Sequence, residues 1–241
     1  MILSVDNICA NGWMNAIRGM RNSRQSWDKS DSKFVETDGK LELGPNDLEL
    51  ASKLAKLGGS HAKFRRMIHV SMDISAPIYW WKEFDTYKIG TTANSTSTMY
   101  SITNKEFELN DFAIDPDMYN LTDEDREKLL TGTLTREEFL EKARIVHPGV
   151  KEHWNATIDI LNSLRNNYNE ASTKAEKYQY WREIIQLLPE SYKQLRTVDM
   201  NYEVVSHIAK ERKGHKLREW GILILEFHKL PYADELIFCD K

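Results

Sequence analysis

The sequence contains few cysteines and no long apolar run, and each shortage excludes a class of protein. Cys9 and Cys239 are its only cysteines, too few for a disulfide framework or a complete zinc site. No apolar stretch approaches the roughly 18 residues of a membrane-spanning helix. Asp6 also interrupts the N-terminus too early for a signal peptide. We therefore expect a cytoplasmic protein with no metal and no membrane partner.

No charge of one sign prevails in the chain. Its 33 Lys and Arg residues stand against 37 Asp and Glu residues, which gives a formal net charge of -4. A general binder of nucleic acid carries an excess of basic residues, so this balance argues against one without excluding a local basic patch. With 41% hydrophobic and 29% charged residues, the composition is typical of a folded globular protein.

Hydrophobic periodicity predicts an α/β fold with a helical majority. The clearest strand is the alternation of Ile68, Val70, Met72 and Ile74 with polar residues. A short strand is expected over 195–200. Helices are expected over 12–20, 45–57, 78–87, 121–168, 173–188, 201–212 and 215–227.

Residues 90–98 form a segment made mostly of Ser, Thr, Gly and Ala. Such residues are common in exposed linkers, which is one interpretation of the segment. The same small side chains also let backbone amides and hydroxyls approach a phosphate, although no Lys or Arg lies between Gly90 and Tyr100. Composition alone leaves both interpretations open.

Trp80, Trp81, Phe84 and Tyr87 give the helix expected over 78–87 an aromatic face. Aromatic rings of this kind can stack on a flavin or on a nucleotide base. At helical spacing they more often fill a core or a subunit interface, and that is the interpretation we favour.

The order of features around the hydroxyl-rich segment resembles the flavin-dependent thymidylate synthases. The matching features are the strand over 68–74, Ala76-Pro77-Ile78, the aromatic helix, Asn94-x-x-Ser97-x-x-Tyr100, Ser60-His61, Arg182-Glu183-Ile184-Ile185, Leu188-Pro189, Tyr192, Asn201, His207, Arg212 and Arg218-Glu219-Trp220. The resemblance covers roughly residues 10–105 and 175–225. It implies one domain over 1–241, in which 106–170 is a variable helical insertion.

The resemblance also implies a fold, a reaction and an assembly. Members of this family share an α/β (α+β) fold, like that of thymidylate synthase-complementing proteins, with an antiparallel or mixed sheet. They make dTMP from dUMP with reduced FAD, methylene-tetrahydrofolate as the carbon donor and NADPH. The family works as a homotetramer and needs no cysteine nucleophile, which agrees with the absence of a central cysteine here.

Four residues of this sequence match the family's nucleotide site. Arg212 matches the arginine that contacts the pyrimidine, where a cation stabilises charge that develops on the ring. Ser97 matches the serine beside the nucleotide, Asn94 the motif's asparagine, and Glu83 a glutamine near the substrate. Arg212 and Ser97 are the expected catalytic residues. Because a carboxylate only accepts hydrogen bonds, whereas glutamine also donates them, Glu83 is expected to alter base recognition.

The expected cofactor-binding residues are Thr86, Tyr87, Lys88, Asn201 and His207. The first three replace the family's Arg-His-Arg triplet, and the last two match positions near the flavin. Other family arginines are replaced by Met99, Gln186 and Glu203. Since charge-assisted hydrogen bonds are the strong ones, these losses predict weaker dUMP binding, by on the order of several kcal/mol, unless other cations substitute. The candidate substitutes are Lys82, Lys88, Arg65 and Arg66.

Three functions are compatible with these residues. The first is an altered flavin-dependent enzyme that modifies a pyrimidine nucleotide, favoured by Arg212, Ser97 and Asn94. The second is a non-catalytic descendant that binds a nucleotide as a regulator or sponge, favoured by the missing arginines. The third is a nucleic-acid-binding module built on the basic stretch 210–218, although such a stretch is usually a solvated helix face. The first is the function that we predict.

Overall fold

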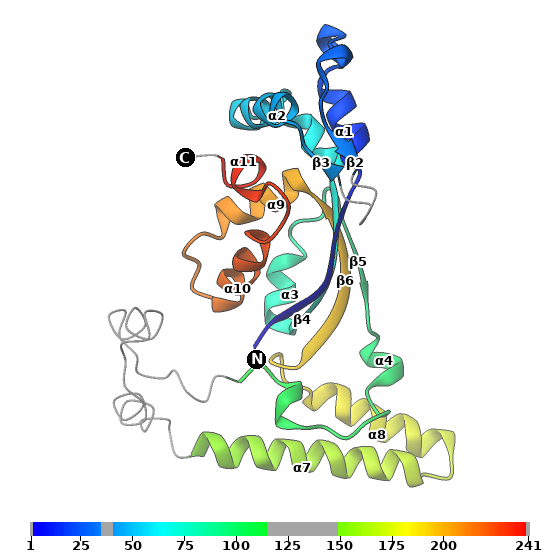
Figure 1. The fold of residues 1–241 in the computed structure, drawn as a ribbon. Helices are drawn as coiled ribbons and strands as arrows, with labels where there is room; N and C mark the ends of the chain where they lie inside the picture. The colour runs from blue at the N-terminus through cyan, green and yellow to red at the C-terminus, as the bar shows by residue number, and fades with distance from the viewer. Residues whose placement is uncertain (1, 35–40, 115–148, 240–241) are drawn as a thin grey trace. The chain divides into compact units, whose positions relative to one another are not determined.

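The computed structural model describes residues 2–34, 41–114 and 149–239. The chain divides into two compact units, shown in Figure 1. The sheet unit comprises Leu3–Thr96 and Gln194–Lys241, and the helical unit comprises Met1–Ile2 and Ser97–Lys193. Within the described ranges, no helix has both the length and the apolar character that crossing a membrane requires. The single-domain assignment over 1–241 stays a prediction.

The sheet unit contains a four-stranded sheet in the order β1-β4-β6-β5. Its strands are β1 (Ser4–Asn11), β4 (His69–Pro77), β6 (Lys193–Asn201) and β5 (Thr91–Ser95). β1 pairs with β4 and β5 with β6, both antiparallel. The expected α/β class and the strand around 68–74 are thereby confirmed. The hydroxyl-rich segment, by contrast, is largely strand β5, because its backbone pairs with β6.

Helices cover one face of this sheet. Val70, Met72 and Ile74 of β4 share a single core with Trp80 and Trp220, which is the reason that the alternating pattern predicts the strand.

The elements of the sheet unit besides the four strands are α1 (Trp13–Met20), η1 (Asn22–Arg24), η2 (Trp27–Lys29), β2 (Lys33–Phe34), β3 (Leu41–Glu42), α2 (Pro45–Leu57), η3 (Ala62–Met67), α3 (Ile78–Phe84), α9 (Tyr202–Glu211), α10 (Arg218–Phe227) and α11 (Ala233–Leu236).

The aromatic helix α3 begins directly after Pro77 and ends at Phe84, three residues before the expected end. Trp80, Trp81 and Phe84 are buried. The ring of Trp80 contacts those of Trp81 and Trp220, with centroids 4.9 and 4.7 Å apart. The rings of Trp80, Trp81 and Phe84 therefore belong to the core and cannot stack on a flavin.

The other face of the sheet is polar. Asp199 on β6 binds two residues of β4: its Oδ1 lies 2.9 Å from His69 Nδ1 and its Oδ2 accepts from Ser71 Oγ at 2.8 Å. Asp73 accepts hydrogen bonds from Thr197 and Asn7, at 2.6 and 2.7 Å, which hold the pKa of its carboxyl below the ordinary value. Side chains on this face thus bind one another across three strands.

The helical unit has its own small core. It contains α4 (Thr98–Ser101), η4 (Leu109–Asp111), α7 (Gly149–Glu170) and α8 (Lys174–Leu187). α7 packs against α8, and Phe107, Phe112, Leu161 and Ile184 belong to one buried cluster. The helix expected over 121–168 is confirmed from Gly149 onward, and its earlier part lies outside the described residues.

Candidate functional site

Arg212 lies at the centre of a polar and aromatic cluster in the sheet unit. Its Nε donates to the Tyr87 hydroxyl at 2.8 Å and its Nη1 donates to Glu83 Oε2 at 3.0 Å. The guanidinium carbon lies 4.5 Å from the centre of the Trp220 ring, close enough for a cation–π interaction. We call Glu83, Tyr87, Arg212, His215 and Trp220 the arginine cluster.

Local structure explains how Arg212 and His215 come together. Asn201 caps α9, because its Oδ1 accepts the Val204 N–H at 3.1 Å, and Arg212 follows the last residue of that helix. Gly214 then adopts a φ of +70, a conformation that glycine allows at little cost. The chain thereby turns and places His215 beside Arg212, with the two side-chain nitrogens 3.2 Å apart.

Glu83 receives several donors at one of its oxygens. Oε2 accepts from Arg212 Nη1 at 3.0 Å and from Trp220 Nε1 at 3.1 Å, and His215 Nε2 lies 3.5 Å away. His215 Nδ1 accepts the Leu217 N–H at 3.1 Å, and its Nε2 faces both Arg212 Nη1, at 3.2 Å, and the carboxylate. Glu83 Oε2 thus makes all of its hydrogen bonds within the protein.

The outer atoms of the ion pair remain open. In the ranges that the structure describes, Arg212 Nη2 and Glu83 Oε1 have no hydrogen-bond partner. The Arg212 side chain is 17% exposed and that of Glu83 is 36% exposed. The pair therefore leaves one donor and one acceptor, on side chains joined at 3.0 Å, without a protein partner, and the Trp220 ring lies against the guanidinium.

Asn94 lies on the opposite face of the sheet from this cluster. It stands across from Thr197, whose hydroxyl binds Asp73 on the polar face. Its neighbour Ala93 stands across from Val198, a residue of the buried core. Ser97 belongs to the helical unit, where its carbonyl accepts from Ser101 Oγ at 2.5 Å. Within the sheet unit, Asn94 and Arg212 are therefore not brought together.

The expected flavin-binding residues have mixed surroundings. Thr86 Oγ1 donates to the Glu83 carbonyl at 2.7 Å, and the Tyr87 hydroxyl accepts from Arg212. Lys88 is exposed, as is His207, whose ring meets Tyr87 edge-on with centroids 5.8 Å apart. Asn201 is buried and caps α9. Of these five residues, Tyr87 belongs to the arginine cluster and His207 lies against it.

This donor set does not fit the diphosphate of FAD. Two phosphate charges call for several cations or free N–H donors. In the part of the chain that is described, Lys88 is the only cation in the Thr86–Lys88 segment. The hydroxyls of Thr86 and Tyr87 already bind protein atoms. The Thr86–Lys88 segment by itself therefore cannot neutralise a flavin diphosphate.

Arg65 and Glu203 form an unexpected buried pair. Arg65 is only 4% exposed, and it donates to Glu203 at 3.0 Å, to Ser206 Oγ at 3.2 Å and to the Leu236 carbonyl at 3.0 Å. The proposal that Arg65 substitutes for a lost phosphate-binding arginine is therefore wrong. The negative charge of Glu203 is likewise compensated within the protein and does not face a ligand alone.

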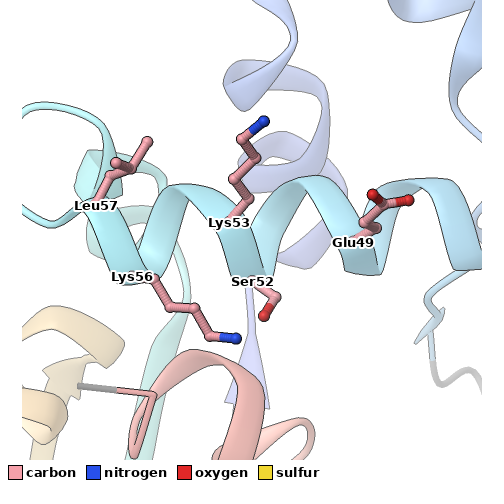
Figure 2. A pocket seen from close by; sticks show the side chains of 5 residues that line it. All are labelled: Glu49, Ser52, Lys53, Lys56 and Leu57. Atoms are coloured by element: carbon pink, nitrogen blue, oxygen red, sulfur yellow. The ribbon is translucent and has the colours of Figure 1, made fainter. Parts of the chain in front are cut away.

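A separate hollow of about 410 Å³ lies along α2. Figure 2 shows its lining side chains, which all come from this one helix: Glu49, Ser52, Lys53, Lys56 and Leu57. Lys53 and Lys56 point to different sides of the helix. None of the five is buried. The hollow therefore lacks the convergent polar groups of a ligand site.

Similarity to known proteins is found at the level of the fold. No protein-family model matches the chain, and no curated protein sequence matches it. Two crystal structures of thymidylate synthase X (ThyX) from Helicobacter pylori, both with FAD and dUMP, are similar over nearly the whole length. One has a TM-score of 0.62 at 19% identity and 99% coverage of both chains, the other 0.61 at 19% and 100% of both. The chain therefore has the fold of the flavin-dependent thymidylate synthase ThyX.

Proposed function

We propose that this protein binds a pyrimidine nucleotide such as dUMP through the arginine cluster. The observation that carries the proposal is the open donor–acceptor pair formed by Arg212 Nη2 and Glu83 Oε1. The fold supports it, because the similar ThyX structures contain dUMP. A protein in the cytoplasm and a homotetrameric assembly, as the resemblance implies, belong to the same proposal.

The cluster suits a base better than it suits a phosphate. Trp220 and Tyr87 fix the guanidinium plane by ring contact and by a hydrogen bond at 2.8 Å. A fixed planar guanidinium donates to a carbonyl oxygen with little loss of side-chain entropy. The Glu83 charge beside it offsets the positive charge that a phosphate would need. The base edge is thus the part of the nucleotide that this site can recognise.

Flavin-dependent methylation of dUMP is the second candidate, favoured by the full-length likeness to ThyX. FAD would supply hydride chemistry when bound, with methylene-tetrahydrofolate as carbon donor and NADPH as reductant. The Thr86–Lys88 segment weighs against it, since this chain gives the diphosphate few donors. A homotetramer would add cations from neighbouring chains. We therefore place nucleotide binding first and flavin turnover second.

Calorimetric titration with dUMP tests the first candidate. We expect saturable binding, and at least tenfold weaker binding of AMP, because a purine edge does not match a site built for a single pyrimidine ring. The same protein is then given FAD, NADPH, methylene-tetrahydrofolate and dUMP tritiated at C5. Binding without tritium release is the expected result. Release above a protein-free control would establish the second candidate, and folded protein that binds no dUMP would contradict both.

A further inference from the structure

The charges of the arginine cluster cancel. Arg212 contributes one positive charge and Glu83 one negative charge, joined at 3.0 Å. His215 adds no charge, because its Nδ1 accepts the Leu217 N–H and is therefore unprotonated. Tyr87 and Trp220, the other residues bonded to this pair, contact it as neutral side chains. The site consequently has no net charge with which to attract an anion.

The unused atoms of the pair define what a ligand must present. Arg212 Nη2 can only donate a hydrogen bond and Glu83 Oε1 can only accept one. The imide edge of uracil meets both demands, since a carbonyl oxygen lies beside the N3–H. With the carbonyl on Arg212, the N3–H points at the carboxylate. Ionised N3 would instead bring a lone pair and a negative charge against Glu83.

We propose that Glu83 is the specificity-determining residue of this site, which makes the protein select the neutral form of a pyrimidine base and reject the same base once N3 is ionised. The inference rests on the proposed binding of a pyrimidine nucleotide at the arginine cluster. A glutamine at this position would carry no charge and could turn its N–H toward an ionised N3. Arg212 would then act as a free cation and favour the anionic base.

Two nucleotides that differ in acidity at N3 test this role. 5-Fluoro-dUMP loses its N3 proton closer to neutral pH than dUMP does. The dissociation constants of dUMP and 5-fluoro-dUMP are measured from neutral to mildly alkaline pH. The quantity compared is the affinity for 5-fluoro-dUMP divided by the affinity for dUMP at each pH. The ratio removes the effects of protein titration at His215, His207 and Tyr87, and of phosphate titration, because both ligands share them. We compare the native protein with Glu83→Gln, which keeps the size of the side chain.

In the native protein, the affinity for 5-fluoro-dUMP relative to dUMP should fall roughly tenfold for each pH unit above the point where its N3 ionises. In Glu83→Gln the ratio should stay level or change in the opposite direction. A level ratio in the native protein overturns the inference and leaves nucleotide binding intact. An equal fall in both proteins overturns the role of Glu83. If neither protein binds either ligand, the proposed function fails and the inference with it.

Should Glu83→Gln not fold, the native profile still decides the selection of the neutral base. Glu83→Ala then tests the residue, because it removes both the charge and the acceptor oxygens. Its circular dichroism and its melting temperature establish folding independently of any ligand. Retention of the full native pH profile in Glu83→Ala would contradict the role of Glu83.

Discussion

Replacing Arg212 by methionine is expected to weaken dUMP binding by about 2 kcal/mol, or roughly thirtyfold, because the ligand loses a hydrogen bond to a charged donor. The loss should be larger for dUMP than for a nucleotide whose base lacks a carbonyl acceptor. Arg212→Lys should recover only part of the affinity. A lysine keeps the charge, but it cannot keep both the Tyr87 contact and the stacking on Trp220.

The matched control for this experiment is Lys210→Met. Lys210 is an exposed cation two residues earlier, near the end of α9. This substitution removes one positive charge from the last turn of α9, two positions before Arg212, and leaves the arginine cluster unchanged. Titration calorimetry should give Lys210→Met an affinity within about twofold of the native value, as for an exposed charge of small energetic weight. An equal loss in both variants would mean that charge alone, and not the cluster, attracts the nucleotide.

Asp47→Asn is expected to lower the free energy of unfolding by about 3–5 kcal/mol, the usual effect of breaking a buried ion pair from one side. Asp47 is completely buried and lies 2.6 Å from the Nε of Arg21, which is 4% exposed. Its other oxygen accepts four hydrogen bonds, from Ser30 Oγ, Asp31 N, Ser32 N and Ser32 Oγ. The variant leaves a buried guanidinium without its counter-charge.

The same carboxylate predicts the acid sensitivity of the fold. Burial acts to raise the pKa of Asp47, but hydrogen bonds from Ser32, Ser30, Arg21 and Asp31 outweigh it and leave the pKa below 3.8. A carboxyl whose pKa is lowered by folding stabilises the protein fully above its unfolded value. This stability is lost as pH falls from about 3.8 through the lower folded value. Asp47→Asn lacks this contribution at every pH.

Urea unfolding at a series of pH values measures both effects. The native protein and Asp47→Asn should differ most near neutral pH and converge as the pH falls below the ordinary carboxyl range. Asp28→Asn is the control, since Asp28 is exposed in the neighbouring η2. It should change stability by less than about 0.5 kcal/mol. A constant difference between native protein and Asp47→Asn down to strong acid would contradict the assignment.

Sequence patterns predicted those elements whose periodicity reflects one buried face. β4, α2, α8 and α9 lie close to their expected bounds for this reason. β1 was missed, because none of its residues is buried and a bulge between Asp6 and Cys9 breaks its alternation. The bulge coincides with a positive φ of 53 at Asn7. β5 was missed because only its backbone pairing with β6, and not its composition, makes it a strand.

The candidate site was predicted only in part. The resemblance singled out Arg212, Glu83 and Tyr87, which the structure joins directly although 125 or more residues separate the arginine from either partner. Trp220 stands in a matching run, but nothing in the sequence indicated that its indole N–H binds Glu83. His215 carried no pattern at all. Such contacts depend on long-range packing of α3, α9 and α10, which local patterns do not encode.

The pairing of Arg65 with Glu203 illustrates the same limit. Sequence reasoning treated the two charges separately, one as a phosphate partner and one as a repelling group. They lie 138 positions apart in the sequence, and Arg65 Nε donates to Glu203 Oε2 at 3.0 Å. Arg65 also donates to the carbonyl of Leu236 in α11. A buried arginine needs such partners, because an uncompensated charge is costly to bury. Arg65 and Glu203, each expected to act on a bound phosphate, therefore form an ion pair within the protein.

Equilibrium dialysis of the native protein against a mixture of FAD and dUMP separates nucleotide binding from flavin binding. Both ligands are quantified on each side of the membrane, so one sample reports nucleotide and flavin binding together. We expect saturable enrichment of dUMP on the protein side, with FAD at the same concentration on both sides of the membrane. FAD bound in a fixed ratio to protein, with absorbance bands that stay with the protein, would contradict it and would restore the flavoenzyme as the leading function.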